Sequence, residues 1–317
     1  MTADASELRP GTTETLVKGK PVAVDTLTLN GLELVVSGTY VRTARVADDW
    51  YTDLDSPEGI IDALRKRSPK VDIFTFWQRL PETAAKYAYY YETESIAALP
   101  ISTYDNWWSE QLNTKTRNLV RKAQKTGIVV KPATFDDDFV HGMTSIFNES
   151  PIRQGKRFWH YGKDAATVKR EFSRFLFREH IFGAYYKDEL IGFIFLAYAG
   201  RYALLGQIIS KLEHRDKAPN NALVAKAVEV CYEKSIPYLV YASWVDGTLG
   251  DFKRHNGFQR VDLPRYYIPL TFKGSIALRF GLHHGLVGAV PDSMREAFVS
   301  LRKNWYARRR GAQPTRQ

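Results

Sequence analysis

The sequence has 317 residues, is 44% hydrophobic and carries a formal net charge of +10, so it can bury a core, and disordered or low-complexity classes are excluded. Its one cysteine, Cys231, excludes a disulfide framework and fits a small buried side chain. The polar segment 1–10 lacks the pattern of a secretory signal, and no apolar run reaches the length of a membrane span, so we expect a cytoplasmic protein.

Residues 1–105 alternate short apolar runs with turn residues, which indicates an α+β region. Strands are predicted at 32–37 and 39–42 around a turn at Gly38, and again at 71–77 and 87–92. A helix is predicted from Pro57 to Arg67, because proline is favoured in a first helical turn. This region carries no recognisable site motif.

The central part of the chain predicts helices and then a run of strands. Residues 114–126 form a basic helix with an apolar stripe at Leu119, Val120 and Ala123. A strand at 128–131 and helices at 135–149 and 165–178 follow. Strands are then predicted at 181–187, 190–198 and 202–209. Their connections are too short for crossovers, so these three strands must be antiparallel.

The last part predicts a parallel element. A helix at 219–234 leads into a buried strand at 238–242, a short helix at 249–255, and strands at 258–261 and 266–271. Helices are predicted beyond, one with Met294, Phe298, Leu301 and Trp305 on one face. The predicted fold is an α/β mixed sheet with helices on both faces. We divide it into residues 1–105, 106–272 and 273–317.

This order of elements resembles the GNAT acyltransferase fold. Two segments, residues 115–127 (KTRNLVRKAQKTG) and 250–258 (GDFKRHNGF), resemble the basic entry helix and the Phe-Lys signature of its Fem-type branch. The resemblance covers about residues 105–272. Because Fem-type enzymes carry two such domains in tandem, residues 1–105 are expected to be a reduced first copy.

The resemblance implies an N-acyltransferase. It would move an acetyl, longer acyl or aminoacyl group from an activated carrier to an amine of a small molecule, sugar or cell-envelope precursor. Acyl-coenzyme A is the expected donor, along Gly206, Gln207, Ile208 and Ile209, with its phosphates over the helix N-terminus at Asn220, Asn221 and Ala222. The alternative for 206–209 is an ordinary strand. The glycine-rich phosphate loop of many GNAT enzymes is replaced by 214–223 (HRDKAPNNAL), so aminoacyl-tRNA stays open as the donor.

Three residues are candidates for the chemistry. Lys253 of the Phe-Lys signature would stabilise the developing oxyanion or bind a phosphate, and its alternative role is a solvated lysine that offsets the helix dipole. Asp246 and Glu149 are candidate bases, together with His160. Residues 247–257 contain no tyrosine, so the general acid stays unassigned.

The loop 150–162 combines basic and aromatic residues, which suits an acceptor ring that carries phosphate. The predicted substrate-binding residues are Arg153, Trp159, His160, Tyr161, Trp244, Arg117 and Arg121. The alternatives are an aromatic plug over the core for the loop, and a solvated face for the basic helix. The histidines do not have the spacing of metal ligands, and no glycine-rich nucleotide-binding motif is recognisable.

Two rival functions follow from the basic charge. A nucleic-acid-binding protein fits the isoelectric point of about 9.4, but no known reading module is recognisable. Peripheral association with the inner face of an anionic membrane fits the C-terminal residues, at about 1 kcal/mol per basic residue. The basic residues concerned are Arg302, Lys303, Arg308, Arg309, Arg310 and Arg316. The membrane role is compatible with an enzyme.

Overall fold

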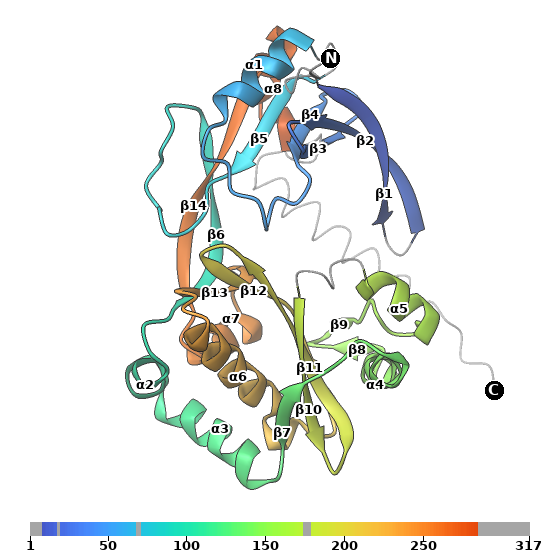
Figure 1. The fold of residues 1–317 in the computed structure, drawn as a ribbon, viewed down its shortest axis with the longest axis vertical. Coiled ribbons are helices and arrows are strands. Elements are labelled where there is room, and N and C mark those ends of the chain that lie inside the picture. Colours follow the sequence, from blue (N-terminus) through green and yellow to red (C-terminus); the bar gives the residue numbers. More distant parts are fainter. Residues whose placement is uncertain (1–7, 18–19, 68–70, 174–178, 285–317) are drawn as a thin grey trace, which may run out of the picture.

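The computed structural model describes residues 8–17, 20–67, 71–173 and 179–284. In these residues, one 12-stranded sheet runs through two lobes in the order β1-β2-β3-β4-β5-β14-β6-β13-β12-β11-β10-β7 (Figure 1). The second C-terminal helix and the basic tail that the sequence predicts lie outside the described residues. Among the described helices, none has the length and apolar character needed to cross a lipid bilayer.

The N-terminal lobe is a meander followed by a crossover. Its elements are β1 (Arg9–Val17), β2 (Lys20–Leu29), β3 (Leu32–Ser37), β4 (Thr43–Val46), α1 (Glu58–Arg67) and β5 (Ile73–Trp77). Strands β1 to β4 are antiparallel neighbours, and the crossover through α1 makes β5 parallel to β4. Asn30 and Gly31 both have positive φ angles, of 49° and 80°, which is the geometry of a tight hairpin between β2 and β3.

The C-terminal lobe repeats this plan on a larger scale. Its first elements are α2 (Tyr104–Asn106), the π-helical turn η1 (Trp107–Gln111), α3 (Thr114–Lys125), β7 (Val129–Pro132), α4 (Asp137–Asn148), the small hairpin β8 (Ile152–Arg153) and β9 (Lys156–Arg157), and α5 (Ala165–Phe172). The next are β10 (Glu179–Tyr186), β11 (Glu189–Ala199), β12 (Tyr202–Ser210), η3 (Arg215–Lys217), α6 (Pro219–Glu233), β13 (Tyr238–Ser243) and α7 (Thr248–His255). Strand β13 is parallel to β12.

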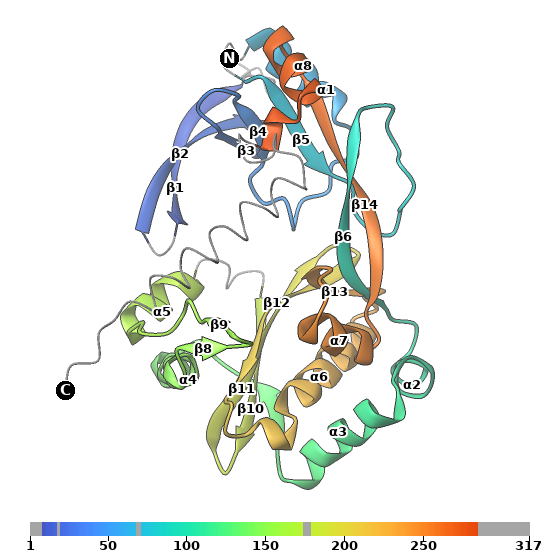
Figure 2. The same ribbon diagram turned by 180° about the vertical axis from the view of Figure 1, so that it is seen from behind.

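Two helical layers enclose this larger half of the sheet. Helices α3 and α6 cover one face, and α4 and α5 cover the other (Figures 1 and 2). Alternation along β12 matches the two layers, because Ile208 packs against the core beneath α6 while Ile209 belongs to the core beneath α4. Cys231 of α6 is fully buried, as its apolar context predicts.

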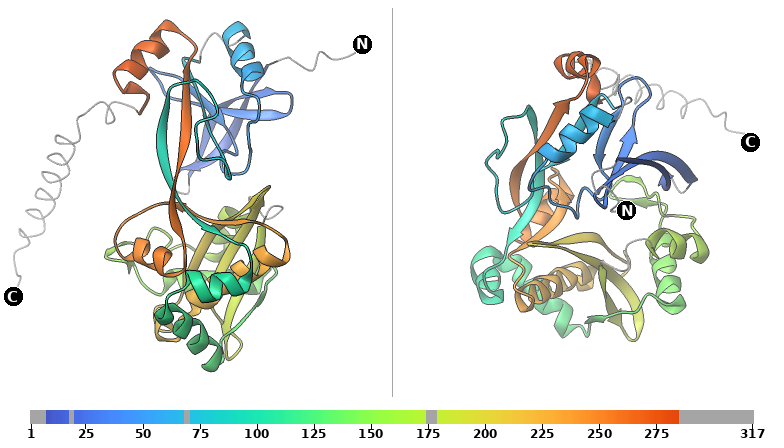
Figure 3. Two further views of the ribbon diagram at one scale, coloured as in Figure 1. Left: turned by 90° about the vertical axis from the view of Figure 1, so that its left-hand side faces the viewer. Right: turned by 45° about the horizontal axis from the view of Figure 1, so that its top comes forward.

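Strands β6 (Tyr91–Pro100) and β14 (Gln259–Pro269) join the lobes by exchange. β6 comes from the N-terminal half but lies between β13 and β14, while β14 from the C-terminal half lies between β5 and β6. These two strands form the waist of the molecule (Figure 3, left). The units β4-α1-β5 and β12-α6-β13 thus have the same topology, and each borrows a strand from the other half. α8 (Phe272–Arg279) and η4 (Leu282–His284) are the last described elements and pack on the N-terminal lobe.

Most predicted elements from residue 114 on are present within a few residues, and the mixed α/β class is confirmed. The two strands predicted at 258–261 and 266–271 are wrong, because they are one strand, β14. Pro264 lies inside β14, just before Arg265 begins to pair with β5. The N–H that proline lacks therefore interrupts no ladder on the β5 side of the strand. The strand predicted at 87–92 is displaced to β6, and β1 and β2 are new. The boundary at residue 105 stays a prediction, and the sheet is continuous across it.

We expect the exchanged strands to make the two lobes unfold as one unit. Ile268 of β14 is 1% exposed in the core of the N-terminal lobe, so Ile268→Ala should cost about 2–5 kcal/mol. Native-state hydrogen exchange should show an equal loss of protection in β3 and in β11. The control Ile276→Ala, on an exposed face of α8, should change stability by less than about 0.5 kcal/mol. Unchanged protection of β11 in Ile268→Ala would contradict a shared unit.

Candidate functional site

Strands β12 and β13 pair at one end and separate at the other. The parallel ladder joins Tyr202 to Tyr238, Ala203 to Leu239 and Leu204 to Val240, and there it stops. Beyond it, β12 continues to Ser210 and β13 to Ser243. We call residues 205–210 and 241–243 the fork. In each of these segments, one edge faces the opening of the fork and is not paired with another strand. Backbone N–H and C=O groups on that edge can therefore bind a ligand.

A bulge marks the β12 side of the fork. Phe195 faces Gln207 and Leu196 faces Leu205, so Gly206 is an extra residue in β12. Gly206 is exposed, Gln207 and Ile208 are half-buried, and Ile209 is buried. The four residues predicted to contact the donor therefore lie together on this side of the fork. Their role in donor binding stays a prediction.

Glu149 and Arg153 hold the end of β12. The Glu149 carboxylate accepts hydrogen bonds from the N–H groups of Leu212 (2.6 Å) and Glu213 (2.9 Å) and from the Arg153 guanidinium (3.0 Å). Arg153 also donates to the Ser210 carbonyl (2.8 Å) and to the Ile146 carbonyl (2.7 Å). Both side chains are thus engaged by protein groups, in contacts that fix where the loop leaves β12.

Lys253 of α7 holds the end of β13. Its ammonium donates to the carbonyls of Tyr241 and Ser243, both at 2.7 Å, and lies 4.4 Å from the centre of the Tyr241 ring. The residue is 2% exposed, so the alternative of a solvated lysine is wrong. Between these carbonyls Ala242 has a φ of 48°, a left-handed conformation that costs a non-glycine residue free energy. Ala242 falls where the pairing of β13 with β6 shifts register, between Val240 and Ser243, and beyond the last residue paired with β12.

Burial also changes the acidity of Lys253. Removal from water disfavours the charged form and lowers the pKa of Lys253 from its usual value to about 8. Two of the three ammonium N–H groups are used by the carbonyls, so one remains for a further acceptor. A cation with a free donor beside the fork is suited to stabilise a developing negative charge.

The rest of the Phe-Lys signature packs α7 against its neighbours. A Cβ added to Gly250 would lie 2.1 Å from the Val245 carbonyl oxygen, so this close approach requires glycine. Asn256 is fully buried, where its carbonyl accepts from the Trp107 indole (3.0 Å) and its side chain accepts from Asn221 of α6 (3.2 Å). The motif therefore fixes the position of Lys253 relative to α6 and η1.

The N-terminus of α6 is less open than the sequence suggests. Ala218 precedes the helix in the left-handed conformation, and its carbonyl accepts from the N–H groups of Asn221 (3.1 Å) and Ala222 (3.4 Å). Asn221 and Ala222 are both buried, and Pro219 has no N–H. In this described segment, the first-turn N–H group of Asn220 takes no part in these hydrogen bonds. The predicted phosphate contact at Asn220, Asn221 and Ala222 stays a prediction.

The two arginines of the basic helix α3 have protein partners. Arg117 donates to the carbonyls of Trp108, Ser109 and Leu112, which fastens α3 to the preceding turn. Arg121 lies over the Trp108 ring, 5.3 Å from its centre. The exposed cations of α3 also include Lys115, Lys122 and Lys125. They make an exposed basic face, and α3 packs against α6 and η3. The predicted substrate contacts of Arg117 and Arg121 stay predictions.

The loop 150–162 is divided between core and surface. His160 is buried and stacks on Phe147 with ring centres 4.4 Å apart. This burial, together with the nearby Lys163 ammonium, lowers the pKa of His160 to about 4, so its ring is neutral at pH 7. His160 therefore packs among aromatic rings, and the predicted role of this loop in acceptor binding stays a prediction. Trp159 and Tyr161 are exposed, and Lys163 lies 3.6 Å from the centre of the Trp159 ring.

Asp246 and Trp244 follow the end of β13. Asp246 is exposed, and Trp244 is half-buried with Arg254 5.7 Å from its ring centre. The Trp244 N–H donates to the Ser95 carbonyl, which continues the pairing of β13 with β6. Lys253 and Trp244 thus lie on the β13 side of the fork, and Glu149 and Arg153 lie on the β12 side.

Two groups of side chains in the described residues have metal-ligand types within reach of one another. They are Glu92, His283 and His284 on the N-terminal lobe, and Glu189, Glu213 and His214 near the end of β12. In the first group, Glu92 already accepts hydrogen bonds from both histidines, at 2.8 and 2.7 Å. Neither group adjoins Lys253.

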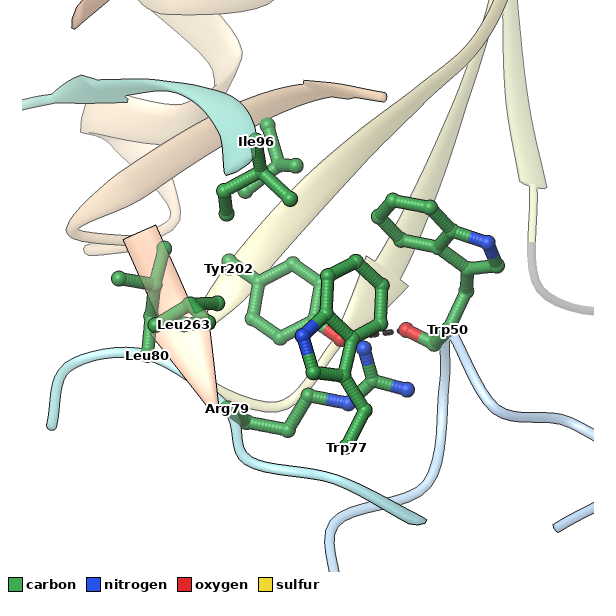
Figure 4. Close-up of a pocket in the computed structure, with 8 residues that line it drawn as sticks. Trp50, Trp77, Arg79, Leu80, Ile96, Tyr202 and Leu263 are labelled. Carbon is green, nitrogen blue, oxygen red and sulfur yellow. Dashed lines mark hydrogen bonds between the residues drawn. The ribbon is translucent and has the colours of Figure 1, made fainter. Parts of the chain in front are cut away.

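Sequence analysis missed the polar groups of the N-terminal half that reach the C-terminal lobe. Arg79 follows the fully buried strand β5 and is itself 4% exposed. In the segment IFTFWQRL, a charged residue follows a continuous apolar run. This pattern was a usable signal of a buried polar contact, because arginine is rarely buried without a partner. The residues that surround Arg79 in the fold, Trp50 and Tyr202, are remote from it in sequence (Figure 4).

Comparison with known proteins supports the fold. No protein-family model and no curated protein matches the chain. The crystal structure of FemX is 10% identical and covers 86% of this chain and 90% of its own, with a TM-score of 0.50. The C-terminal domain of a putative lysylphosphatidylglycerol synthetase from Agrobacterium fabrum is 11% identical and covers 79% of this chain and 84% of its own, with a TM-score of 0.51. The chain therefore has the GNAT-type fold in the Fem-type arrangement that its sequence resembles.

We expect Glu149→Gln to destabilise the protein. An amide cannot accept all the bonds that the carboxylate accepts from Leu212, Glu213 and Arg153, so the change should cost about 1–3 kcal/mol in chemical unfolding. Amide exchange of Leu212 and Glu213 should accelerate. The control Glu189→Gln, whose side chain is 49% exposed, should cost less than about 1 kcal/mol. Unchanged stability of Glu149→Gln would show that its bonds do not hold this loop.

Proposed function

We propose that this protein is an N-acyltransferase, and that the acyl group passes from an activated carrier to an amine at the fork between β12 and β13. One observation carries the proposal. The fork presents backbone groups of Gly206 to Ile208 on one side and the buried Lys253 ammonium, with a free N–H, on the other. The GNAT-type fold supports the same reading by analogy.

The proposed chemistry uses the backbone N–H groups and the Lys253 ammonium at the fork. A neutral amine attacks the ester or thioester carbonyl, forming the C–N bond and placing negative charge on the carbonyl oxygen. N–H groups of the bulge and of Lys253 donate to that oxyanion. Its collapse breaks the bond to the carrier, and the proton lost by the amine neutralises the leaving oxygen or thiolate. Lys253 therefore acts as a charged donor, and it must be protonated to do so.

Two carriers fit this chemistry. Acyl-coenzyme A is the donor that the sequence predicts, with its chain along Gly206 to Ile209. The covered N-terminus of α6 favours the second candidate, aminoacyl-tRNA, because one free first-turn amide is a poor cradle for a pyrophosphate. The exposed cations of α3 lie beside η3 and could neutralise RNA phosphates. We propose an amine-bearing small molecule, sugar or cell-envelope precursor as the acceptor, and the cytoplasmic face of the membrane as the place of reaction.

Binding experiments should separate the two donors. If the donor is aminoacyl-tRNA, the double variant Lys122→Ala/Lys125→Ala should weaken tRNA binding by about tenfold at 100 mM salt and flatten its salt dependence. The control Lys66→Ala, an exposed lysine of α1, should leave binding unchanged. Saturable heat on titration with acetyl-coenzyme A or longer acyl forms, without tRNA binding, would instead establish the thioester donor. Binding of neither donor would contradict the proposed transferase.

The pH dependence of turnover should report the charge of Lys253. Hydroxylamine is a suitable acceptor because it stays unprotonated above neutral pH. Hydroxamate formation from the bound donor should fall as the pH rises through about 8, since the ammonium loses its proton there. Lys253→Met should lower kcat by roughly a hundredfold or more, while Lys253→Arg should keep activity above pH 8. Turnover that rises through pH 8 would mean that the neutral amine is the active form, contrary to the proposal.

A further inference from the structure

A carboxylate of β6 lies between two histidines of η4 on the N-terminal lobe. Oε1 of Glu92 is 2.8 Å from Nε2 of His283, and Oε2 is 2.7 Å from Nε2 of His284. One potential metal-binding atom from each of the three side chains lies within 4.8 Å of the other two. Glu92 precedes His283 by 191 residues. Because the fold assembles this group from such distant residues, histidine spacing alone does not reveal it.

Packing holds one of the histidines and leaves the group open to solvent. The His283 side chain is 2% exposed and meets the Tyr267 ring edge-on, with ring centres 4.7 Å apart. The side chains of His284 and Glu92 are 43% and 30% exposed, so an ion can reach the group from solvent. Nδ1 of His283 is buried and has no hydrogen-bond partner in the described part of the chain. No second contact therefore commits Nε2 to carrying the proton, and its lone pair can bind a metal.

The charge of Glu92 is not taken by a basic side chain of the described residues. Its carboxylate contacts the two histidines and the Tyr90 hydroxyl (3.1 Å), and it forms an ion pair with no described lysine or arginine. Arg265 lies opposite Glu92 in the ladder of β14 and β6. Its guanidinium instead bonds Glu94 at 2.6 Å and Asp49 at 2.8 Å. The carboxylate of Glu92 is therefore available to a bound cation.

The second group with metal-ligand types differs in this respect. In that group, the Lys211 ammonium forms ion pairs with both carboxylates, those of Glu189 and Glu213. An ammonium at this point repels a divalent cation and already neutralises the carboxylates that would bind it. Of the two groups found in the described residues, the one at Glu92 is thus the better suited to hold a metal ion.

The ligand types select the class of metal. Two imidazoles and one carboxylate suit zinc, whereas magnesium and calcium prefer oxygen ligands. Zinc binds imidazole nitrogen and carboxylate oxygen at about 2.0–2.2 Å, so ligand atoms around a tetrahedral ion lie roughly 3.4 Å apart. Small rotations of the three side chains would open the present contacts to that spacing. Three protein ligands leave a fourth position for water.

We propose that Glu92, His283 and His284 bind one zinc ion, which ties η4 to β6. The ion takes the place of the direct contacts and bonds Nε2 of each histidine and an oxygen of Glu92. Because only the folded chain brings these ligands together, zinc binding stabilises the folded protein. The site shares no residue with the fork, so it stands whether or not the fork is catalytic.

Metal titration of the untagged, chelator-treated protein tests the proposal. Calorimetry at about neutral pH should show one equivalent of Zn²⁺ bound, and Mg²⁺ should bind at least a hundredfold more weakly. Zn²⁺ should also raise the unfolding temperature. Absence of saturable Zn²⁺ binding, or binding of Mg²⁺ as tight as that of Zn²⁺, would overturn the proposal.

Variants locate the ligands. His284→Ala and Glu92→Gln should each weaken Zn²⁺ binding at least tenfold and remove the rise in unfolding temperature. The control His214→Ala removes a histidine of the second group and should change binding less than about twofold. If His283→Ala fails to fold, the two more exposed ligands still decide. Unchanged Zn²⁺ binding in either His284→Ala or Glu92→Gln, or an equal loss in His214→Ala, would overturn the site.

Discussion

The separation of β12 from β13 is the constraint on which the candidate site depends. Two parallel strands gain hydrogen bonds by remaining paired, so something must hold them apart. On the β12 side the ion pair of Arg153 and Glu149 occupies the carbonyl of Ser210 and the amides that follow it. On the β13 side Lys253 occupies the carbonyls of Tyr241 and Ser243. Each of these charged side chains, partly buried for Glu149 and Arg153 and fully buried for Lys253, thus takes a backbone group that pairing or solvent would otherwise take.

Sequence patterns predicted the C-terminal lobe well because its elements are local. The apolar stripe of α3, the meander β10 to β12 and the helix α6 follow from periodicity and short connections. The Phe-Lys motif located Lys253 at the site, but its burial could not be predicted, because the covering groups come from β13. The same limit applies to Glu149 and Arg153, because the backbone groups that they hold at 210–213 lie more than fifty residues away.

The N-terminal half was the harder case. Its core is completed by Tyr266 and Ile268 of β14, which are nearly two hundred residues further along the chain. Arg79 left one local signal, a charge at the end of a buried apolar run, but its surroundings are assembled from Trp50, Trp77 and Tyr202. Long-range assembly of this kind leaves little trace in periodicity, which explains why no site was predicted there.

The exchange of β6 and β14 has a consequence for how such a chain could arise. A gene encoding one half alone would produce a sheet with an unfilled position beside its parallel crossover, and with one long strand projecting from its edge. Two identical copies could fill each other's positions reciprocally, which is the geometry of a domain-swapped homodimer. Fusion of the two genes would then free each half to diverge. In this chain the two lobes are unequal in size, while the topology of the parallel crossover is the same in both.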